Sequence, residues 1–175
     1  LYSSAASDVY KRQALRELDR YALIAFVSPN AIDAAFAARP DWPWHIPLAV
    51  VGEGSRMALL RHGASKANAT IVSPTDLERT DSETLLAELD LPALRGKQVL
   101  IIRGETGREL LGDTLRAAGI GVTPLAAYRR VAPEWNSARR SELKRLLSCQ
   151  NDWIVTSSEG LRFLTEMVAQ LDEAG

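Results

Sequence analysis

Short apolar runs alternate with amphipathic segments along most of the chain. The apolar runs lie at residues 22–27, 47–51, 69–72, 98–102 and 121–127, and several end in small or hydroxyl residues. The segments between them carry apolar residues at helical spacing. Continuous apolar strands that alternate with helices are typical of a parallel sheet covered on both faces. The pattern therefore predicts an α/β fold with a parallel flavodoxin-like or doubly wound sheet.

Several predicted helices carry recognisable start and stop signals. The Ser-Pro pair at 28–29 predicts an N-cap with proline at the first helical position. The sequences at 80–83 and 106–109 each match a capping box. The second box lies within a helix predicted over residues 105–118, which Gly119 ends.

The pattern changes near residue 130, which predicts a domain boundary. Residues 14–129 supply enough strands and helices for one complete middle α/β domain. Residues 130–135 contain a proline and predict an interdomain linker. Residues 136–175 predict part of a second α/β domain. Residues 1–13 show neither helical nor strand periodicity, and we interpret them as a non-native or adaptor-derived leader.

The segment after the linker contains too few elements to fold alone. Its pattern predicts a helix over 136–147, a strand over 152–156 and a helix over 158–171. A single strand between two helices cannot bury both of its faces. We therefore expect the remainder of the second domain to lie outside these 175 residues.

Composition narrows the classes of function. The net charge is -1, from 21 basic and 22 acidic side chains, which does not favour binding to nucleic acid or to an anionic membrane. The apolar runs are too short to span a bilayer, and no signal peptide is visible, so we expect a cytoplasmic protein. Cys149, His45 and His62 lack metal-ligand spacing, and no dinucleotide or phosphate-loop motif occurs. Hence no metal or cofactor is predicted.

The turns after the strands carry the candidate binding residues. In open parallel sheets, ligands bind beyond the carboxyl ends of the strands, and helix N-termini there accept carboxylates or phosphates without lysines. Plain helix capping accounts for the same residue types, so both interpretations stay open for each position. The candidate binding residues are Ser28, Asn30, Gly52, Ser55, Ser82, Arg103, Gly104, Thr106, Gly107, Ser157 and Ser158.

One tyrosine is a candidate for chemistry. Tyr128 ends a predicted strand just before Arg129 and close to the predicted linker. From its position alone, the residue is either a hinge anchor or a phenolic proton donor. The sequence by itself does not decide between these two roles.

Five blocks, in order, resemble the uroporphyrinogen-III synthase family. The resemblance covers residues 14–175. Val27 and Ser55 stand where the family more often has threonine. The blocks are FVSPNA at 26–31, VGEGS at 51–55, DSETLL at 81–86, a central block with VLIIRGETGRELL at 99–111 and AYRR at 127–130, and WIVTSSEGL at 153–161.

The resemblance implies a two-domain lyase. One α/β domain of the family is continuous, and the other is assembled from both chain ends. The opening strand before residue 14 and the closing turn after residue 175 are therefore expected to be missing from this copy. The activity implied is the cyclisation of hydroxymethylbilane, a linear polycarboxylate tetrapyrrole, to uroporphyrinogen III. The reaction loses water and inverts ring D through a spiro intermediate.

The resemblance also assigns a role to Tyr128, which matches the tyrosine of the family at its cleft. A phenol stays protonated at neutral pH and can assist the departure of the ring A hydroxyl. The protein is expected to work as a monomer without a cofactor. The alternative is a non-enzymatic two-lobed protein that binds small anions, because such lobes also close on a ligand.

Overall fold

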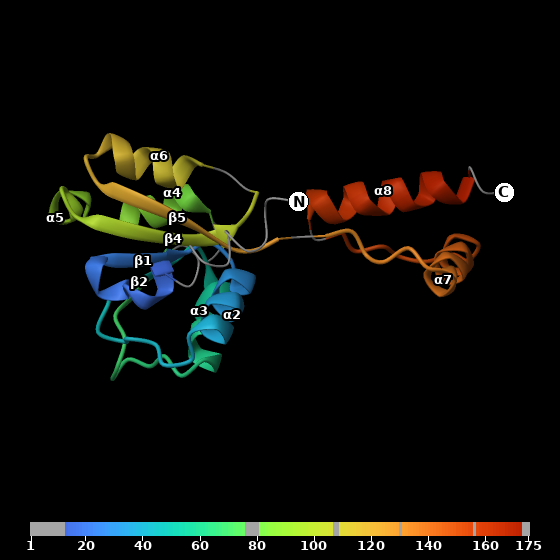
Figure 1. Ribbon diagram of the computed structural model, residues 1–175. Helices are drawn as coiled ribbons and strands as arrows, with labels where there is room; N and C mark the ends of the chain where they lie inside the picture. The colour runs from blue at the N-terminus through green and yellow to red at the C-terminus, as the bar shows by residue number, and fades with distance from the viewer. Residues whose placement is uncertain (1–12, 76–80, 107–108, 130, 156, 173–175) are drawn as a thin grey trace. The chain divides into compact units, whose positions relative to one another are not determined.

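The computed structural model divides the chain into two units, Leu1–Arg130 and Val131–Gly175, which we describe separately (Figure 1). The residues described are 13–75, 81–106, 109–129, 131–155 and 157–172.

A five-stranded parallel sheet forms the centre of the first unit. Its order is β3-β2-β1-β4-β5, so β1 lies between β2 and β4. In the flavodoxin order β1 lies between β2 and β3, and the order found here is that of the other doubly wound class. The predicted parallel α/β sheet is confirmed. The strands are β1 (Leu23–Phe26), β2 (Leu48–Val50), β3 (Ile71–Val72), β4 (Gln98–Gly104) and β5 (Gly121–Tyr128).

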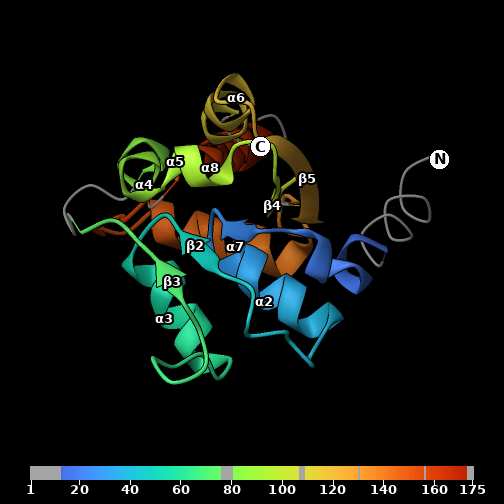
Figure 2. The ribbon, with the colours of Figure 1, turned by 90° about the vertical axis from the view of Figure 1, so that its left-hand side faces the viewer.

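Helices cover both faces of this sheet (Figure 2). Side chains of α2 (Pro29–Ala38) and α3 (Glu53–Arg61) form one apolar cluster with one face. Side chains of α4 (Ser82–Glu88) and α6 (Leu110–Ala117) form a second cluster with the opposite face, and α5 (Leu91–Leu94) packs at its margin. A short 3₁₀ helix, η1 (Leu18–Arg20), precedes β1.

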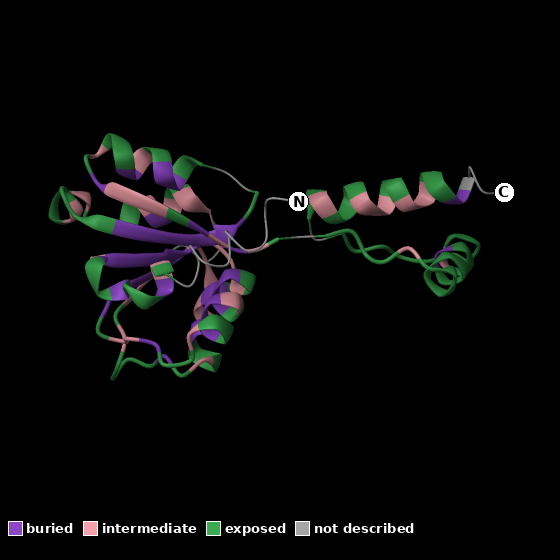
Figure 3. Ribbon diagram, viewed as in Figure 1, coloured by how far each residue is buried: buried purple, intermediate pink, exposed green. Residues whose placement is uncertain are grey.

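Alternation along β1 connects the two clusters. Ile24 and Phe26 belong to the cluster of α2 and α3, whereas Leu23 and Ala25 belong to that of α4 and α6. All four residues are buried, as the continuous purple of β1 shows (Figure 3). A strand buried on both faces must be apolar at successive positions, which is why β1 reads as an uninterrupted apolar run.

Aromatic side chains fill the space beneath the loop that follows α2. The ring of Phe36 stacks on Trp42 and on His62, each with centroids 4.6 Å apart. Phe26 and Trp44 contact the same ring at 6.4 and 5.5 Å. Phe36 therefore joins β1, the loop and the end of α3 in one packed group.

The helix starts match the predictions in part. Ser28 is the N-cap of α2 as predicted, and its hydroxyl accepts a hydrogen bond from the Ala31 N–H. The box predicted at 80–83 is wrong by one residue, because Asp81 is the N-cap and pairs with Thr84. The Asp81 carboxylate reaches the third N–H of the helix from the residue directly before it, and Thr80 lies outside the described residues.

The helix predicted over 105–118 is shorter than expected. It begins at Leu110, with Glu109 as its N-cap residue, so the box predicted at 106–109 is also wrong. The Glu109 carboxylate accepts a hydrogen bond from Arg103 instead of turning back on its own helix. The predicted end is confirmed, since Gly119 follows with φ of +79°, a conformation that favours glycine.

The second unit contains two helices, α7 (Ser137–Leu147) and α8 (Ser158–Asp172). They contact one another, and Leu143 and Leu171 are buried. The strand predicted over 152–156 is wrong for residues 152–155, which have no regular structure, and Thr156 lies outside the described residues. A strand requires a partner strand, and the described residues of this unit supply none. The second α/β domain therefore stays a prediction.

Replacing Phe36 by alanine tests the aromatic group. The change Phe36→Ala should lower the free energy of unfolding by about 3–5 kcal/mol, because it removes a buried ring and leaves a cavity. Urea unfolding, followed by near-ultraviolet circular dichroism, would measure the loss. Met57→Ala on the exposed side of α3 is the control, and it should change stability by about 0.5 kcal/mol or less. Equal effects of the two changes would contradict this packing.

Candidate functional site

The strand order places a crevice at the carboxyl ends of β1 and β4. Connections from β1 run toward β2 on one side of this point, while the chain continues from β4 to β5 on the other. The loops after β1 and β4 therefore diverge, and ligands of open α/β sheets bind at such a reversal. Ser28 follows β1, and Gly104 ends β4.

A depression with room for about 280 Å³ of solvent lies beside this crevice. The turn between β1 and α2 and the turn between β2 and α3 form its walls. The first N–H groups of α3 are therefore close to it, with the partial positive charge of a helix N-terminus, whereas α2 begins with Pro29, which has no N–H, and its Ala31 N–H already donates to Ser28. Gly52, the N-cap of α3, has no side chain with which to cap the helix. The lining residues are Val27, Ser28, Pro29, Val51, Gly52, Glu53, Gly54 and Ser55.

Ser55 gives this depression a hydroxyl group. The residue is only 3% exposed, yet it lines the depression. A hydroxyl at this position can donate to or accept from a polar ligand in the depression.

Glu53 and Arg56 form an ion pair at the margin of the depression. Arg56 Nε and Nη2 donate to the two carboxylate oxygens of Glu53, each at 2.7 Å. This hydrogen bonding lowers the pKa of the Glu53 carboxyl and raises the pKa of the Arg56 guanidinium. Glu53 is therefore charged at neutral pH but is compensated by its neighbour, which limits its repulsion of an anion.

Tyr128 reaches this region from the far side of β4. It is the last residue of β5, and its Oη lies 3.1 Å from the Oγ of Ser28 after β1. Because β4 lies between these two strands, the side chain spans two strand spacings, about 10 Å. A Cβ on Gly104 would lie 3.1 Å from Tyr128 Cζ and 3.3 Å from its Oη. Glycine at 104 therefore leaves the space across which the phenol extends.

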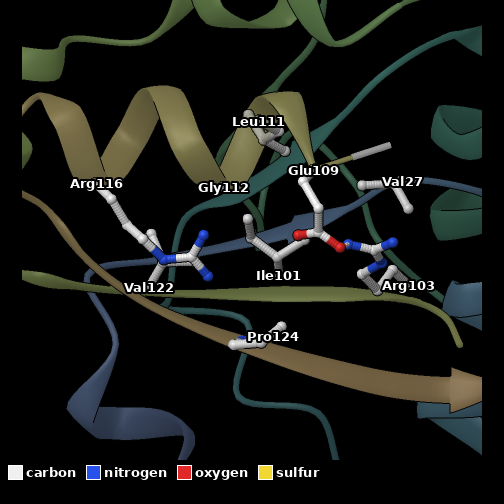
Figure 4. A pocket seen from close by; sticks show the side chains of 9 residues that line it. All are labelled: Val27, Ile101, Arg103, Glu109, Leu111, Gly112, Arg116, Val122 and Pro124. Carbon is white, nitrogen blue, oxygen red and sulfur yellow. Dashed lines mark hydrogen bonds and ion pairs between the residues drawn. The ribbon is translucent and has the colours of Figure 1, made fainter. Parts of the chain in front are cut away.

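Arg103 lies elsewhere, beneath the start of α6 (Figure 4). Its Nη1 donates to Glu109 Oε1 at 2.6 Å, and its Nε donates to the carbonyl oxygen of Gly104 at 3.3 Å. The residue is 8% exposed. The cavity beside it has room for about 10 Å³, which corresponds to one water molecule rather than a substrate. Its guanidinium charge is thus already paired within the protein.

The family of the chain follows from comparison with known proteins. The family model described as HEM4, Uroporphyrinogen-III synthase HemD, matches residues 7–174. The chain belongs to the uroporphyrinogen-III synthase family. The alternative of a non-enzymatic anion-binding protein gains no support from this match.

Relatives in the family include two enterobacterial proteins named uroporphyrinogen-III synthase. The one from Escherichia coli K12 is 35% identical over 130 residues, which are 74% of this chain and 50% of the relative. The one from Salmonella typhimurium LT2 is 31% identical over 150 residues, which are 85% of this chain and 59% of the relative. The chain therefore spans about half the length of the curated relatives that it matches.

Solved structures of family members share the fold. The uroporphyrinogen-III synthase of the extremely thermophilic bacterium Thermus thermophilus matches with a TM-score of 0.53 and 17% identity, over 90% of this chain and 60% of that one. The enzyme of Helicobacter pylori 26695 matches with a TM-score of 0.52 and 17% identity, over 72% and 54%. These likenesses support the fold alone.

The structure brings some of the predicted family site residues together and separates others. Ser28, Gly52 and Ser55 line the depression, and Gly104 and Tyr128 lie at the crevice beside it. The other predicted residues have the following positions. Asn30 is exposed in the first turn of α2, Ser82 is the first residue of α4, Arg103 pairs with Glu109, Thr106 is exposed after β4, Gly107 lies outside the described residues, and Ser157 and Ser158 belong to the second unit.

Capping accounts for Ser157, whereas Ser82 lies next to a cap without being one. The hydroxyl of Ser157 accepts a hydrogen bond from the Gly160 N–H, which is the geometry of an N-cap for α8. Ser82 follows the Asp81 cap on a helix of the opposite sheet face. Sequence reasoning missed Glu53 and Arg56, although acidic and basic residues three apart at a helix start are the usual signal of such a pair.

Two features are absent from the residues that the structure describes. The described residues contain no group of three or more histidine, cysteine, aspartate or glutamate side chains that could hold a metal ion. Among the same residues, no helix has the length and apolar character needed to cross a bilayer.

The Arg103–Glu109 pair can be tested by neutralising the carboxylate. We expect Glu109→Gln to lower the free energy of unfolding by about 1–2 kcal/mol, because Arg103 is buried and loses its charged partner. The matched control is Asp113→Asn in the same helix, whose partner Arg116 is 44% exposed and can be solvated instead. Urea unfolding of both variants measures the difference, and a larger loss for Asp113→Asn would refute the assignment.

Proposed function

We propose that this protein acts as a uroporphyrinogen-III synthase: a lyase that cyclises hydroxymethylbilane with inversion of ring D and loss of water. Its place would be in tetrapyrrole biosynthesis. Membership of the family supports the proposal. The observation that carries it is the Tyr128 hydroxyl, which lies at the sheet reversal beside a depression with two helix N-termini. The chain spans about half the length of its curated relatives, so we propose this activity for a protein that has the full length of the family.

The acetate and propionate groups of the substrate are the groups that the depression would bind. Carboxylates accept hydrogen bonds from the free N–H groups at the start of α3, which has no side-chain cap, and the helix dipole favours their charge. The hydroxyl of Ser55 offers a further donor. Gly52 and Gly54 keep the turn low, so that a ligand can approach the backbone closely.

Tyr128 would act as the general acid. Its proton passes to the hydroxyl oxygen of ring A, the carbon–oxygen bond breaks with its electron pair on oxygen, and water leaves. The phenolate balances the cationic azafulvene that forms. Ring D is attacked at its substituted carbon, the bond that first joined it to the chain breaks, and ring D is joined again in the inverted orientation. The proton that the substrate releases in these steps then returns to the phenolate. The net change is then the loss of one water, and no redox partner is needed.

Control of conformation would be the larger task of the protein. Hydroxymethylbilane closes without an enzyme to the uninverted isomer, as the family resemblance implies. The protein must hold both ends of the substrate so that the substituted carbon of ring D is attacked instead. Binding groups at fixed helix N-termini suit this task, because their positions do not change as charge develops.

The wider organisation forms part of the same proposal. Residues 14–129 would be the middle domain, 130–135 the linker and 136–175 part of the second domain. The protein would work as a monomer in the cytoplasm, and its chemistry requires no metal or organic cofactor.

Replacing Tyr128 by phenylalanine tests the acid. The assay is run on two proteins. One is the chain itself, and the other is a hybrid of family length, in which segments of the Escherichia coli relative supply the part that the chain does not span. Tyr128→Phe should reduce turnover by about a hundred- to ten-thousand-fold, the usual contribution of a positioned general acid. KM should change much less, because the carboxylate contacts remain.

The ratio of inverted to uninverted product completes the test. If turnover falls and the product made by the enzyme stays inverted, Tyr128 is an acid and the binding groups set the isomer. If turnover stays near normal, the phenol is not an essential acid. Tyr21→Phe is a suitable control, because Tyr21 is a buried tyrosine before β1 and packs in the apolar cluster.

A further inference from the structure

Tyr128 lies on a sheet face that regular alternation along β5 would not give it. Val122 packs in the cluster of α4 and α6, whereas Leu125 and Ala127 belong to the cluster of α2 and α3. Successive side chains of a strand point to opposite faces, so a regular β5 would carry Tyr128 on the face of Val122. Tyr128 instead packs against the same cluster as its immediate neighbour Ala127.

A bulge in the pairing of β5 with β4 accounts for this placement. Arg103 pairs with Ala126, but Gly104 pairs with Tyr128, so Ala127 is an extra residue of β5. Residues that pair directly in a parallel sheet share a face, and one extra residue moves the next side chain to the other face. The bulge therefore carries the ring of Tyr128 over Gly104, on the face of α2 and α3.

The side chain of Arg103 holds this bulge from the opposite face of the sheet. It lines the small cavity beneath α6 with Ile101 and Leu111, which belong to the cluster of α4 and α6. From there, Nε donates to the carbonyl oxygen of Gly104 at 3.3 Å, and Nη1 donates to Glu109 Oε1 at 2.6 Å. The guanidinium thus joins the bulged backbone to the start of α6. Because Arg103 is buried, water weakens these bonds little.

We propose that Arg103 is the positioning residue of Tyr128, because it holds Gly104 in the bulged register and so directs the tyrosine ring to the crevice. Without this hold, β5 can return to regular pairing, in which Ala127 lies opposite Gly104 and Tyr128 turns to the face of α6. The inference concerns the placement of the ring, whichever hydroxyl donates in the contact with Ser28. It deepens the proposed function and rests on that function where turnover is the readout.

Contacts between Gly104 and the tyrosine ring report the register in the chain itself. The Cβ position of Gly104 lies 3.1 Å from Tyr128 Cζ and 3.4 Å from Cε2, so the Gly104 Hα on that side should show a nuclear Overhauser effect to the ring protons. Arg103→Met removes both donors and keeps an apolar stem, and this effect should be lost. The Glu105 N–H, which donates to the Tyr128 carbonyl oxygen, should exchange with solvent about tenfold faster or more.

Three further variants separate positioning from a general loss of stability. Leu115→Ala truncates a fully buried side chain of α6 that does not line the cavity beside Arg103, and it should keep the Overhauser effect. Tyr128→Phe should also keep it, because the bulge rather than the hydroxyl places the ring. Glu109→Ala leaves Arg103 in place but removes its charged partner, and it should weaken the effect even if Arg103→Met fails to fold.

Turnover connects the register with the proposed reaction. In the hybrid of family length, Arg103→Met should lower kcat about ten- to a hundredfold, because a displaced acid is poorly aligned, and KM should change much less. In the Tyr128→Phe background the same substitution should cause no further loss, because the group that it positions is gone. Leu115→Ala should retain most of the turnover.

The outcomes that overturn the inference are distinct from failure of the proposed function. If Arg103→Met and Glu109→Ala both keep the Overhauser effect, other contacts hold the bulge and the positioning role is wrong. It is equally wrong if Tyr128→Phe or Leu115→Ala loses the effect, or if Arg103→Met lowers kcat as much in the Tyr128→Phe background as alone. A fully active Tyr128→Phe removes the proposed acid role, whereas the ring contact in the chain itself still decides whether Arg103 places Tyr128.

Discussion

The central position of β1 is the constraint on which the site depends. All four residues of β1 are buried, and they belong alternately to the clusters on the two sheet faces. Because β1 pairs with both β2 and β4, the chain must leave its carboxyl end between two diverging loops. The crevice therefore follows from the strand order and does not depend on any particular polar residue. Ser28, which follows Val27 after the end of β1, supplies one.

A tyrosine side chain that crosses β4 then turns this crevice into a candidate reaction site. β5 does not touch β1, so a group at its end can reach Ser28 only by crossing β4. The sheet register changes at this point, and Gly104 pairs with Tyr128 after an irregularity at Arg103 and Gly104. A side chain at 104 would fill the path of the phenol. The same irregularity comes directly after Arg103, whose guanidinium pairs beneath α6 with Glu109.

The sequence predicted the parts of this arrangement that depend on local pattern. The apolar runs identified the five strands, and the three central ones, β2, β1 and β4, are buried along nearly their whole length, which requires continuous apolar character. Ser28 was predictable as an N-cap, and Gly119 as a helix end, since each follows from the chemistry of a single turn. The strand order, by contrast, is set by long-range pairing. That Tyr128 meets Ser28, a hundred residues away, could not be derived from either neighbourhood.

The wrong predictions for α6 and for residues 152–156 have one kind of cause. In both, a pattern within one segment was outweighed by the presence or absence of contacts with other segments. The start of α6 was predicted five residues early because Thr106 and Glu109 match a capping box, whereas Glu109 is engaged by Arg103 from a neighbouring strand. The strand predicted at 152–156 has the right composition, but Ile154 is 91% exposed where the structure describes it. Apolar composition predicts a strand only where partner strands exist, and a pattern within one segment carries no information about them.

The electrostatics of the site bear on the proposed binding of a polyanion by a protein with a net charge of -1. Two arginines of this region, Arg56 and Arg103, both donate to carboxylates of the protein, and so they add little free positive charge. What remains for a ligand is a small set of backbone N–H groups at the start of α3 and the hydroxyl of Ser55. Such groups act over a short range and only in fixed directions. Attraction by net charge would hold a flexible tetrapyrrole in many arrangements, whereas fixed donors select one. A reaction whose outcome depends on which carbon of ring D is attacked requires selection of that kind.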